Sequence, residues 1–174
     1  MRLIGLSGWS GSGKTTLITV LLPVLIARGR TVSTVKHAHH SFEVDKPGKD
    51  SFVHRQAGAY EVLISSEKRF ALMRELRGAP EPRLQDLLGR LGPVDLVLVE
   101  GFKREAHPKI EIHREVIGKP LLYPGDPQVV AIASDPPLAE APIPHVGLND
   151  IEAIADLVER HAVQPSEIAW GALR

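Results

Sequence analysis

The chain has 174 residues, of which 43% are hydrophobic and 24% are charged, a composition typical of a soluble globular domain rather than a disordered or membrane-spanning chain. Its 21 basic and 21 acidic residues give a formal net charge of zero, which argues against nucleic-acid binding driven by bulk charge. No cysteine is present, so thiolate catalysis, cysteine-ligated zinc and disulfides are excluded. We expect one cytoplasmic domain over residues 1–174, without nucleic-acid or membrane partners.

A phosphate-binding loop is the strongest motif of the chain. Residues 8–15 match the pattern G-x-x-x-x-G-K-[ST] at every position. The residues expected to bind nucleotide are Gly8, Trp9, Ser10, Gly11, Ser12, Gly13, Lys14, Thr15 and Thr16. The glycines let backbone N–H groups turn towards a phosphate, Lys14 would reach the β- and γ-phosphates, and the Thr15 hydroxyl would coordinate Mg²⁺.

The flanking residues place this loop in the required context. A short apolar run of strand type precedes it at 2–7, and apolar residues at helical spacing follow it over 17–26, with Gly29 as a stop signal. The order strand, loop, helix predicts a single domain that binds a nucleoside triphosphate or a close analogue.

The remaining elements alternate between strands and helices. Further strands are predicted at 31–35, 60–65, 70–73, 94–99, 109–114 and 129–133, and further helices at 51–57, 84–91 and 151–158. The strand at 109–114 alternates polar and apolar residues, as a half-exposed strand does, and the polar turn at 66–69 predicts a hairpin. The pattern predicts an α/β fold: a three-layer sandwich of P-loop NTPase type around a mostly parallel sheet, with a β-hairpin excursion.

Ligands of such sheets bind at the carboxyl ends of the strands, which selects among the acidic residues. Glu100 closes the strand at 94–99 and Asp95 opens it, about 16 Å away at 3.3 Å per residue, so Glu100 is the expected acid near the metal. Asp135 follows a late strand, where its carboxylate would accept hydrogen bonds from a guanine base. An acid that begins the turn at Pro136 is an equally open interpretation of Asp135.

Two polar segments lie near the second strand. Lys36 and His37 are candidates for phosphate or substrate contacts, whereas the spacing of His37, His39 and His40 does not favour a metal site. Residues 45–51 alternate charges around Pro47-Gly48, as a solvated loop does, and also offer acids to a metal or water and lysines to a bound phosphate.

Taken together, these segments resemble one family. The phosphate loop, the histidine-rich end of the second strand, Asp-Lys-Pro-Gly-Lys-Asp-Ser at 45–51 and Leu-Val-Glu-Gly-Phe-Lys at 98–103 occur in this order in the MobB family of molybdopterin-guanine dinucleotide biosynthesis adapter proteins. The resemblance spans roughly residues 3–158. It implies that Lys14 and Thr15 hold phosphate and Mg²⁺, and that Asp45 and Glu100 are the matching acids near the metal.

The resemblance also implies a function. It suggests a homodimeric GTP-binding protein with weak intrinsic GTPase activity, which assists the MobA-type transferase that joins GMP to molybdopterin; molybdopterin itself is a further candidate ligand. No residue plainly serves as a water-positioning glutamine or an arginine finger. Two alternatives stay open: a small-molecule kinase with a lid built from Arg69, Arg74, Arg77 and Arg83, and a scaffold whose loop binds phosphate only structurally.

Overall fold

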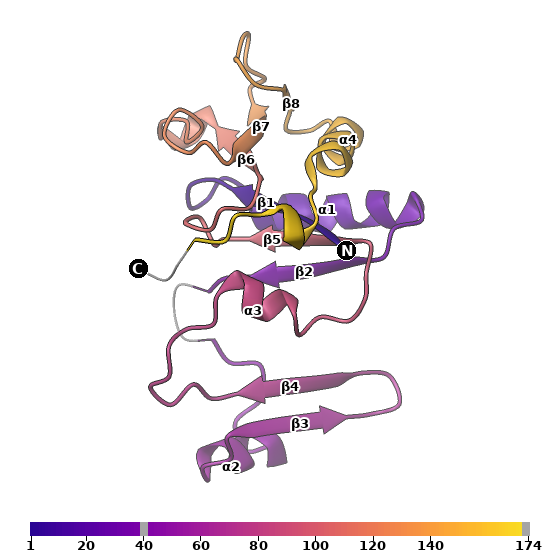
Figure 1. Cartoon of the computed structure of the whole chain (residues 1–174), viewed down its shortest axis with the longest axis vertical. Helices are drawn as coiled ribbons and strands as arrows, with labels where there is room; N and C mark the ends of the chain where they lie inside the picture. Colours follow the sequence, from indigo (N-terminus) through magenta and orange to yellow (C-terminus); the bar gives the residue numbers. More distant parts are fainter. Residues whose placement is uncertain (39–41, 172–174) are drawn as a thin grey trace. The chain divides into compact units, whose positions relative to one another are not determined.

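The computed structural model describes residues 1–38 and 42–171 of the chain (Figure 1). It contains two compact units: Met1–His37 together with Leu84–Arg174, and the intervening segment Ala38–Arg83. The expectation of one nucleotide-binding domain over residues 1–174 stays a prediction. No helix within the described residues is long and apolar enough to traverse a membrane.

The first unit is built on a six-stranded sheet. Its strands are β1 (Arg2–Ser7), β2 (Val32–Lys36), β5 (Leu96–Glu100), β6 (Lys109–Arg114), β7 (Val129–Asp135) and β8 (His145–Gly147). They pair in the order β2-β5-β1-β6-β7-β8, and every neighbouring pair is parallel. The predicted parallel sheet is confirmed. All six strands therefore end at the same edge of the sheet.

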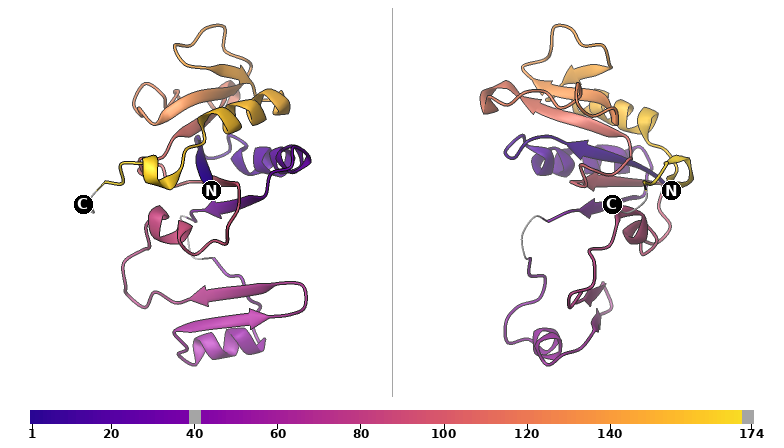
Figure 2. Two further views of the ribbon diagram at one scale, coloured as in Figure 1. Left: turned by 45° about the vertical axis from the view of Figure 1, so that its right-hand side comes forward. Right: turned by 60° about the vertical axis from the view of Figure 1, so that its left-hand side comes forward.

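Helices cover both faces of this sheet and complete a three-layer sandwich (Figure 2). On one face, α1 (Lys14–Ala27) and α4 (Ile151–His161) pack their apolar residues against strand residues such as Ile4 and Ile110. On the other face lie α3 (Leu84–Leu88) and the short 3-10 helix Pro165–Glu167, where a smaller core includes Leu3 and Val97. A second 3-10 helix, Glu115–Ile117, follows β6. The predicted α/β class is confirmed.

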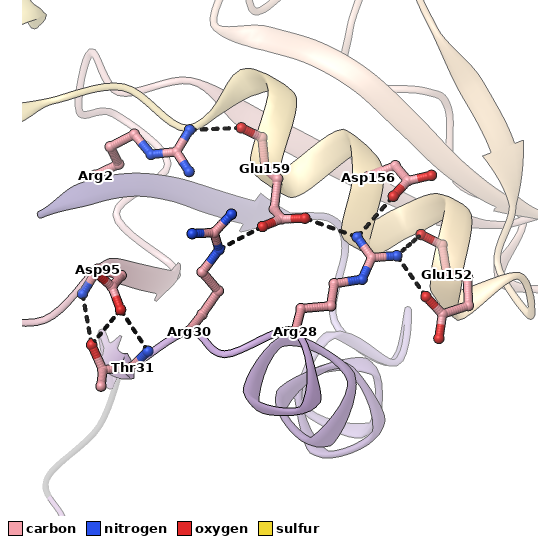
Figure 3. A network of polar contacts seen from close by, with 8 residues as sticks. All are labelled: Arg2, Arg28, Arg30, Thr31, Asp95, Glu152, Asp156 and Glu159. Atoms are coloured by element: carbon pink, nitrogen blue, oxygen red, sulfur yellow. Dashed lines mark hydrogen bonds and ion pairs between the residues drawn. The ribbon is translucent and has the colours of Figure 1, made fainter.

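Ion pairs and hydrogen bonds of charged side chains connect the end of α1 to α4 (Figure 3). Arg28, just beyond α1, donates to Asp156 at 2.8 Å and to Glu159 at 2.9 Å. Arg30 also donates to Glu159, at 2.7 Å, and Arg2 at the start of β1 donates to the backbone carbonyl of Glu159. This network lies beside the amino end of β1, which is the edge opposite the phosphate loop.

The expectation of a half-exposed strand at 109–114 is wrong. Lys109 and Glu111 are each only 1% exposed, in a strand that lies between β1 and β7. Lys109 donates to the carbonyl of Glu105 at 2.8 Å and to Asp126 at 3.2 Å. The alternation of polar residues here reflects a buried polar layer whose groups have partners inside the protein, which is the condition for burying charge.

The second unit contains α2 (Asp50–Gln56) and the antiparallel hairpin of β3 (Glu61–Ser65) and β4 (Phe70–Arg74), confirming the predicted hairpin. This unit buries few large apolar side chains. Val62 is 8% exposed, whereas Leu63, Phe70 and Leu72 on the other face of the hairpin are 63%, 74% and 47% exposed. The hairpin therefore presents an apolar face to solvent.

Candidate functional site

The phosphate loop runs from the end of β1 to the start of α1. Gly8 is required by close packing, because a Cβ there would lie 2.5 Å from the backbone oxygen of Ile112 in β6. Gly13 adopts a left-handed conformation and its carbonyl accepts the first helical hydrogen bond, from Leu17, at 2.8 Å. The loop therefore lies directly at the N-terminus of α1, where backbone N–H groups favour an anion.

The Lys14 side chain folds back over this loop. Its Nζ donates to the carbonyls of Gly8 at 3.0 Å and Trp9 at 2.9 Å. Burial lowers the pKa of Lys14 from its ordinary value, and the nearby Lys103 and Lys36 lower it further against the opposing effect of Glu100. The surroundings of the Lys14 ammonium thus disfavour its positive charge, and a bound phosphate would supply the negative charge that stabilises it.

Thr15 and Glu100, both predicted to lie at the metal, are in contact, and their role as metal ligands stays a prediction. The Thr15 hydroxyl donates to Glu100 Oε1 at 2.9 Å, and the Glu100 side chain is only 12% exposed. The Lys36 ammonium lies 3.4 Å from each of these two oxygens. Hydroxyl and carboxylate oxygens are ligands that suit Mg²⁺, and here both already lie close to a cation, so the pair fits a magnesium site.

The other acids lie elsewhere. Asp95 accepts hydrogen bonds from the backbone N–H and hydroxyl of Thr31, which lower the pKa of its carboxyl, at the opposite edge of the sheet from Glu100 (Figure 3). Asp45 belongs to the second unit, where it is ion-paired with Arg55 at 2.9 Å, and its proposed role near the metal stays a prediction.

The histidine segment contributes packing at the end of β2. The His37 ring lies 5.0 Å from the Phe102 ring, and a Cβ on Gly101 would lie 2.7 Å from the His37 Cβ. Gly101 therefore lets the chain after Glu100 approach β2 closely. His39 and His40 lie outside the described residues, and within those residues no group of three or more His, Cys, Asp or Glu is arranged to hold a metal ion.

Trp9 connects the phosphate loop to two neighbouring loops. Its Nε1 donates to the carbonyl of Pro120 at 2.8 Å, and the ammonium groups of Lys103 and Lys119 lie 5.5 and 5.7 Å from the ring centroid. The sequence motifs gave neither lysine a role, although Lys103 is the last residue of the motif at 98–103. The signal that would have found them is their position just beyond β5 and β6, where loops at the carboxyl edge meet.

A buried carboxylate anchors one of these loops. Glu111 in β6 accepts hydrogen bonds from the backbone N–H groups of Leu122 at 2.7 Å and Tyr123 at 2.9 Å. These bonds draw the chain after β6 back onto the sheet and place Pro120 within reach of Trp9. Glu111, in the buried polar layer of β6, therefore helps to fix the position of the chain segment that contacts Trp9 of the phosphate loop.

Asp135 ends β7, as predicted, and is ion-paired with Arg114 at the end of β6, 2.7 Å away. Arg114 Nε also lies 3.4 Å from the place that a Cβ on Gly13 would occupy. Sequence analysis missed Arg114, although the rule that selected Glu100, a charged residue at the carboxyl end of a strand, applies to it equally. The role of Asp135 in base recognition stays a prediction.

The four arginines considered for a kinase lid all lie in the second unit, with Arg83 as its last residue. Local partners account for Arg74 and Arg77. Arg74 is ion-paired with Glu61 across the hairpin. Arg77 donates to the carbonyls of Arg55 and Ala59, both at 3.2 Å. These contacts account for both side chains without a lid, so no observation favours the kinase alternative.

The parallel sheet, the loop between β1 and α1, and the acid that ends the neighbouring strand define a P-loop NTPase-like α/β protein. The family model of molybdopterin guanine dinucleotide synthesis protein B, MobB, matches residues 3–135. The chain therefore belongs to the MobB family.

Individual relatives agree with this assignment. The molybdopterin-guanine dinucleotide biosynthesis adapter protein of Escherichia coli (strain K12) is 44% identical over 159 residues, which are 90% of each chain. The protein of the same name from Haemophilus influenzae is 45% identical over 160 residues, covering 90% of this chain and 87% of the relative. The crystal structure of Bacillus subtilis MobB superposes with a TM-score of 0.69 at 25% identity, covering 95% of this chain and 99% of that one.

The contact between Thr15 and Glu100 leads to a prediction about magnesium. Glu100→Gln keeps a hydrogen-bond acceptor but loses the charge, so we expect the affinity for Mg²⁺-GTP to fall roughly tenfold or more, and the affinity for GTP without Mg²⁺ to change less. Asp95→Asn is the matched control at the other edge of the sheet. Calorimetric titration with and without Mg²⁺ measures both variants, and a larger magnesium effect in Asp95→Asn would show that the wrong acid has been chosen.

Proposed function

We propose that this protein is a GTP-binding adapter in molybdopterin guanine dinucleotide biosynthesis, which assists a MobA-type transferase in joining GMP to molybdopterin. The observation that carries the proposal is the contact of Thr15 with Glu100 beside Lys14, because it brings together the phosphate-binding and metal-binding groups that such a loop needs. Membership of the MobB family, and the names of the relatives described above, supply the pathway. We expect the protein to act in the cytoplasm.

The parts of the site favour holding a nucleotide over hydrolysing it. Lys14, Thr15, Glu100 and the N-terminus of α1 all act on a bound triphosphate and its Mg²⁺ in the ground state. A site that binds substrate and transition state equally well gains affinity without gaining rate. We therefore propose a weak intrinsic GTPase, far slower than the median enzyme rate of about 10 per second.

Asp135 is the residue that we propose to recognise guanine. An ionised carboxylate only accepts hydrogen bonds, which matches the two donors on the edge of guanine and does not match adenine. The side chain is 42% exposed at the carboxyl edge of the sheet, so a ligand can reach it. Its ion pair with Arg114 orients the carboxylate before the base arrives.

Nucleotide binding is tested by two variants. Lys14→Ala should abolish GTP binding and leave the fold intact, because the Lys14 charge serves the loop and not the core.

Asp135→Ala should reduce the preference for GTP over ATP by roughly a hundredfold, since it removes two hydrogen bonds to a charged acceptor worth about 3 kcal/mol in total. Calorimetry with GTP and ATP measures both. Wild-type GTP affinity in Lys14→Ala would refute the phosphate loop, and an unchanged GTP to ATP ratio in Asp135→Ala would remove Asp135 from the base site.

We also propose that the protein is a homodimer and that the hairpin of β3 and β4 forms part of the contact. Leu63 and Leu72 are directly opposite each other in the hairpin, and Phe70 lies on the same face. A two-stranded hairpin is marginally stable alone and leaves unpaired strand edges, so an exposed apolar face on it is expected to be covered. A second copy of the chain offers a surface of the same shape and character.

The dimer is tested by placing a charge in this apolar face. Leu72→Glu should shift the protein from dimer to monomer, because burying an unpaired carboxylate costs more than the contact gains. Val116→Glu is the control, since Val116 is 89% exposed and lies in the first unit. Light scattering coupled to gel filtration gives the mass of each variant. A monomeric wild-type protein, or a dimeric Leu72→Glu variant, would contradict this surface.

Reconstitution tests the function as a whole. Molybdopterin, Mg²⁺-GTP at limiting concentration and the transferase are incubated with and without the protein, and the guanine dinucleotide is quantified. We expect the protein to raise the yield and Lys14→Ala to fail to do so, because delivery of GTP depends on the loop. Absence of stimulation at every GTP concentration, or rapid GTP hydrolysis by the protein alone, would defeat the adapter proposal.

A further inference from the structure

We propose that Arg114 contacts the phosphate groups of the bound nucleotide directly, and that Asp135 positions its guanidinium at the phosphate loop. This inference rests on the proposed nucleotide binding and adds to it a residue outside the loop motif. It identifies a second source of positive charge, contributed by the strand on the other side of β1 from Glu100.

The register of the sheet brings Arg114 to the loop. β6 pairs with β1 through Ser7 and Glu111, so β6 continues three residues beyond that pair, alongside the start of the phosphate loop. Arg114 is the last residue of β6 and lies opposite Asp135 in β7. Its side chain therefore starts at the carboxyl edge of the sheet, level with the region where the loop holds a ligand.

The guanidinium of Arg114 donates to Asp135 with one nitrogen and lies beside Gly13 with the other two. Nη1 donates to Asp135 Oδ2 at 2.7 Å. Nε lies 3.4 Å, and Nη2 3.7 Å, from the place that a Cβ on Gly13 would occupy. Asp135 thus engages one nitrogen while the other two lie beside Gly13, the residue that precedes α1. A guanidinium offers five donors in a planar fork, so the two nitrogens at the loop are suited to a bidentate contact with phosphate oxygens.

The exposure of the pair favours a ligand contact over a structural one. The Arg114 and Asp135 side chains are 33% and 42% exposed, and ion pairs this exposed contribute little to stability. Arg114 is therefore not held at this position by burial in a core. The guanidinium lies at ordinary van der Waals distance from the place of a Cβ on Gly13, so it reaches the loop without crowding it.

A contact between Arg114 and the phosphates would come from a different side of the loop than the contacts of Lys14 and Lys36. The two lysines approach the loop from its own backbone and from β2, on the side of Glu100. Arg114 approaches from β6, on the other side of β1. A triphosphate in the loop would thus be flanked by cations on two sides, and the planar fork would fix its orientation as well as its charge.

The experiment compares GTP with inorganic tripolyphosphate, which has the phosphates without the base or ribose. Calorimetry is performed on the full chain and on Arg114→Gln, Arg114→Lys and Arg160→Gln. Arg160 is exposed on α4, next to Glu159 at the opposite edge of the sheet, so its variant matches the change in net charge. Thermal unfolding of each unliganded protein reports on the fold.

We expect Arg114→Gln to weaken both ligands by about 10- to 100-fold, the range for a lost hydrogen bond to a charged group. Arg114→Lys should lose several-fold, because it keeps the charge but not the fork, and Arg160→Gln should bind as the wild type does. The unfolding temperature of unliganded Arg114→Gln should stay close to that of the wild type. A structural role alone would move the unfolding temperature and spare the affinity for tripolyphosphate.

Three results separate this inference from the function on which it rests. If the wild type binds GTP and Arg114→Gln binds it equally well, the inference is overturned and the proposed function stands. If Arg114→Gln weakens GTP but not tripolyphosphate, Arg114 acts on the nucleoside and the phosphate contact is wrong. If the wild type binds neither ligand, the proposed function itself fails. Should Arg114→Gln not fold, wild-type affinity for tripolyphosphate in Arg114→Lys overturns the forked contact.

Discussion

The parallel pairing of β1 with β5 on one side and β6 on the other decides where the charged side chains of Glu100, Lys36 and Arg114 lie. In the first pairing Leu6 is level with Glu100, and β2 places Lys36 level with Glu100 in turn. In the second, β6 runs on to Arg114 beside the loop. Because parallel strands share one carboxyl edge, three strands that are far apart in the sequence deliver an acid and two cations to a single loop. A shift of register by one residue in either pairing would turn these side chains to the other face of the sheet.

The second constraint is electrostatic. Lys14, Lys36, Lys103 and Arg114 converge on the loop, and Glu100 and Asp135 are the carboxylates in contact with members of this group. A lysine whose pKa is lowered by the fold is less stable in its charged form than it is in the unfolded chain, so at neutral pH Lys14 costs the unliganded protein stability. A bound phosphate removes that cost. The site is thus arranged around a charge that the protein itself does not supply, which is the physical reason to expect tight binding of an anion.

Sequence analysis predicted the parts of the site that depend on local order, and missed those that depend on the sheet. The phosphate loop is contiguous, and Glu100 follows a continuous apolar strand, so both are visible in the sequence alone. Arg114 was missed because the alternation of 109–114 was interpreted as a half-exposed strand, whose charged residues need no explanation. In the structure β6 is central, Lys109 and Glu111 are buried with partners, and the same alternation carries Arg114 to the loop. Strand order is set by long-range pairing, which periodicity does not encode.

The two units of the chain meet different physical requirements. The first buries its apolar residues on both faces of a sheet, anchors α1 to α4 through Arg28, and carries the phosphate-loop motif after β1. The second leaves Leu63, Phe70 and Leu72 exposed although each is large enough to stabilise a core by about 1.5–3 kcal/mol if buried. The second unit thus keeps apolar surface exposed, whereas the first buries its own. This difference agrees with the proposed function, in which the first unit holds the nucleotide and the apolar face of the second contacts another copy of the chain.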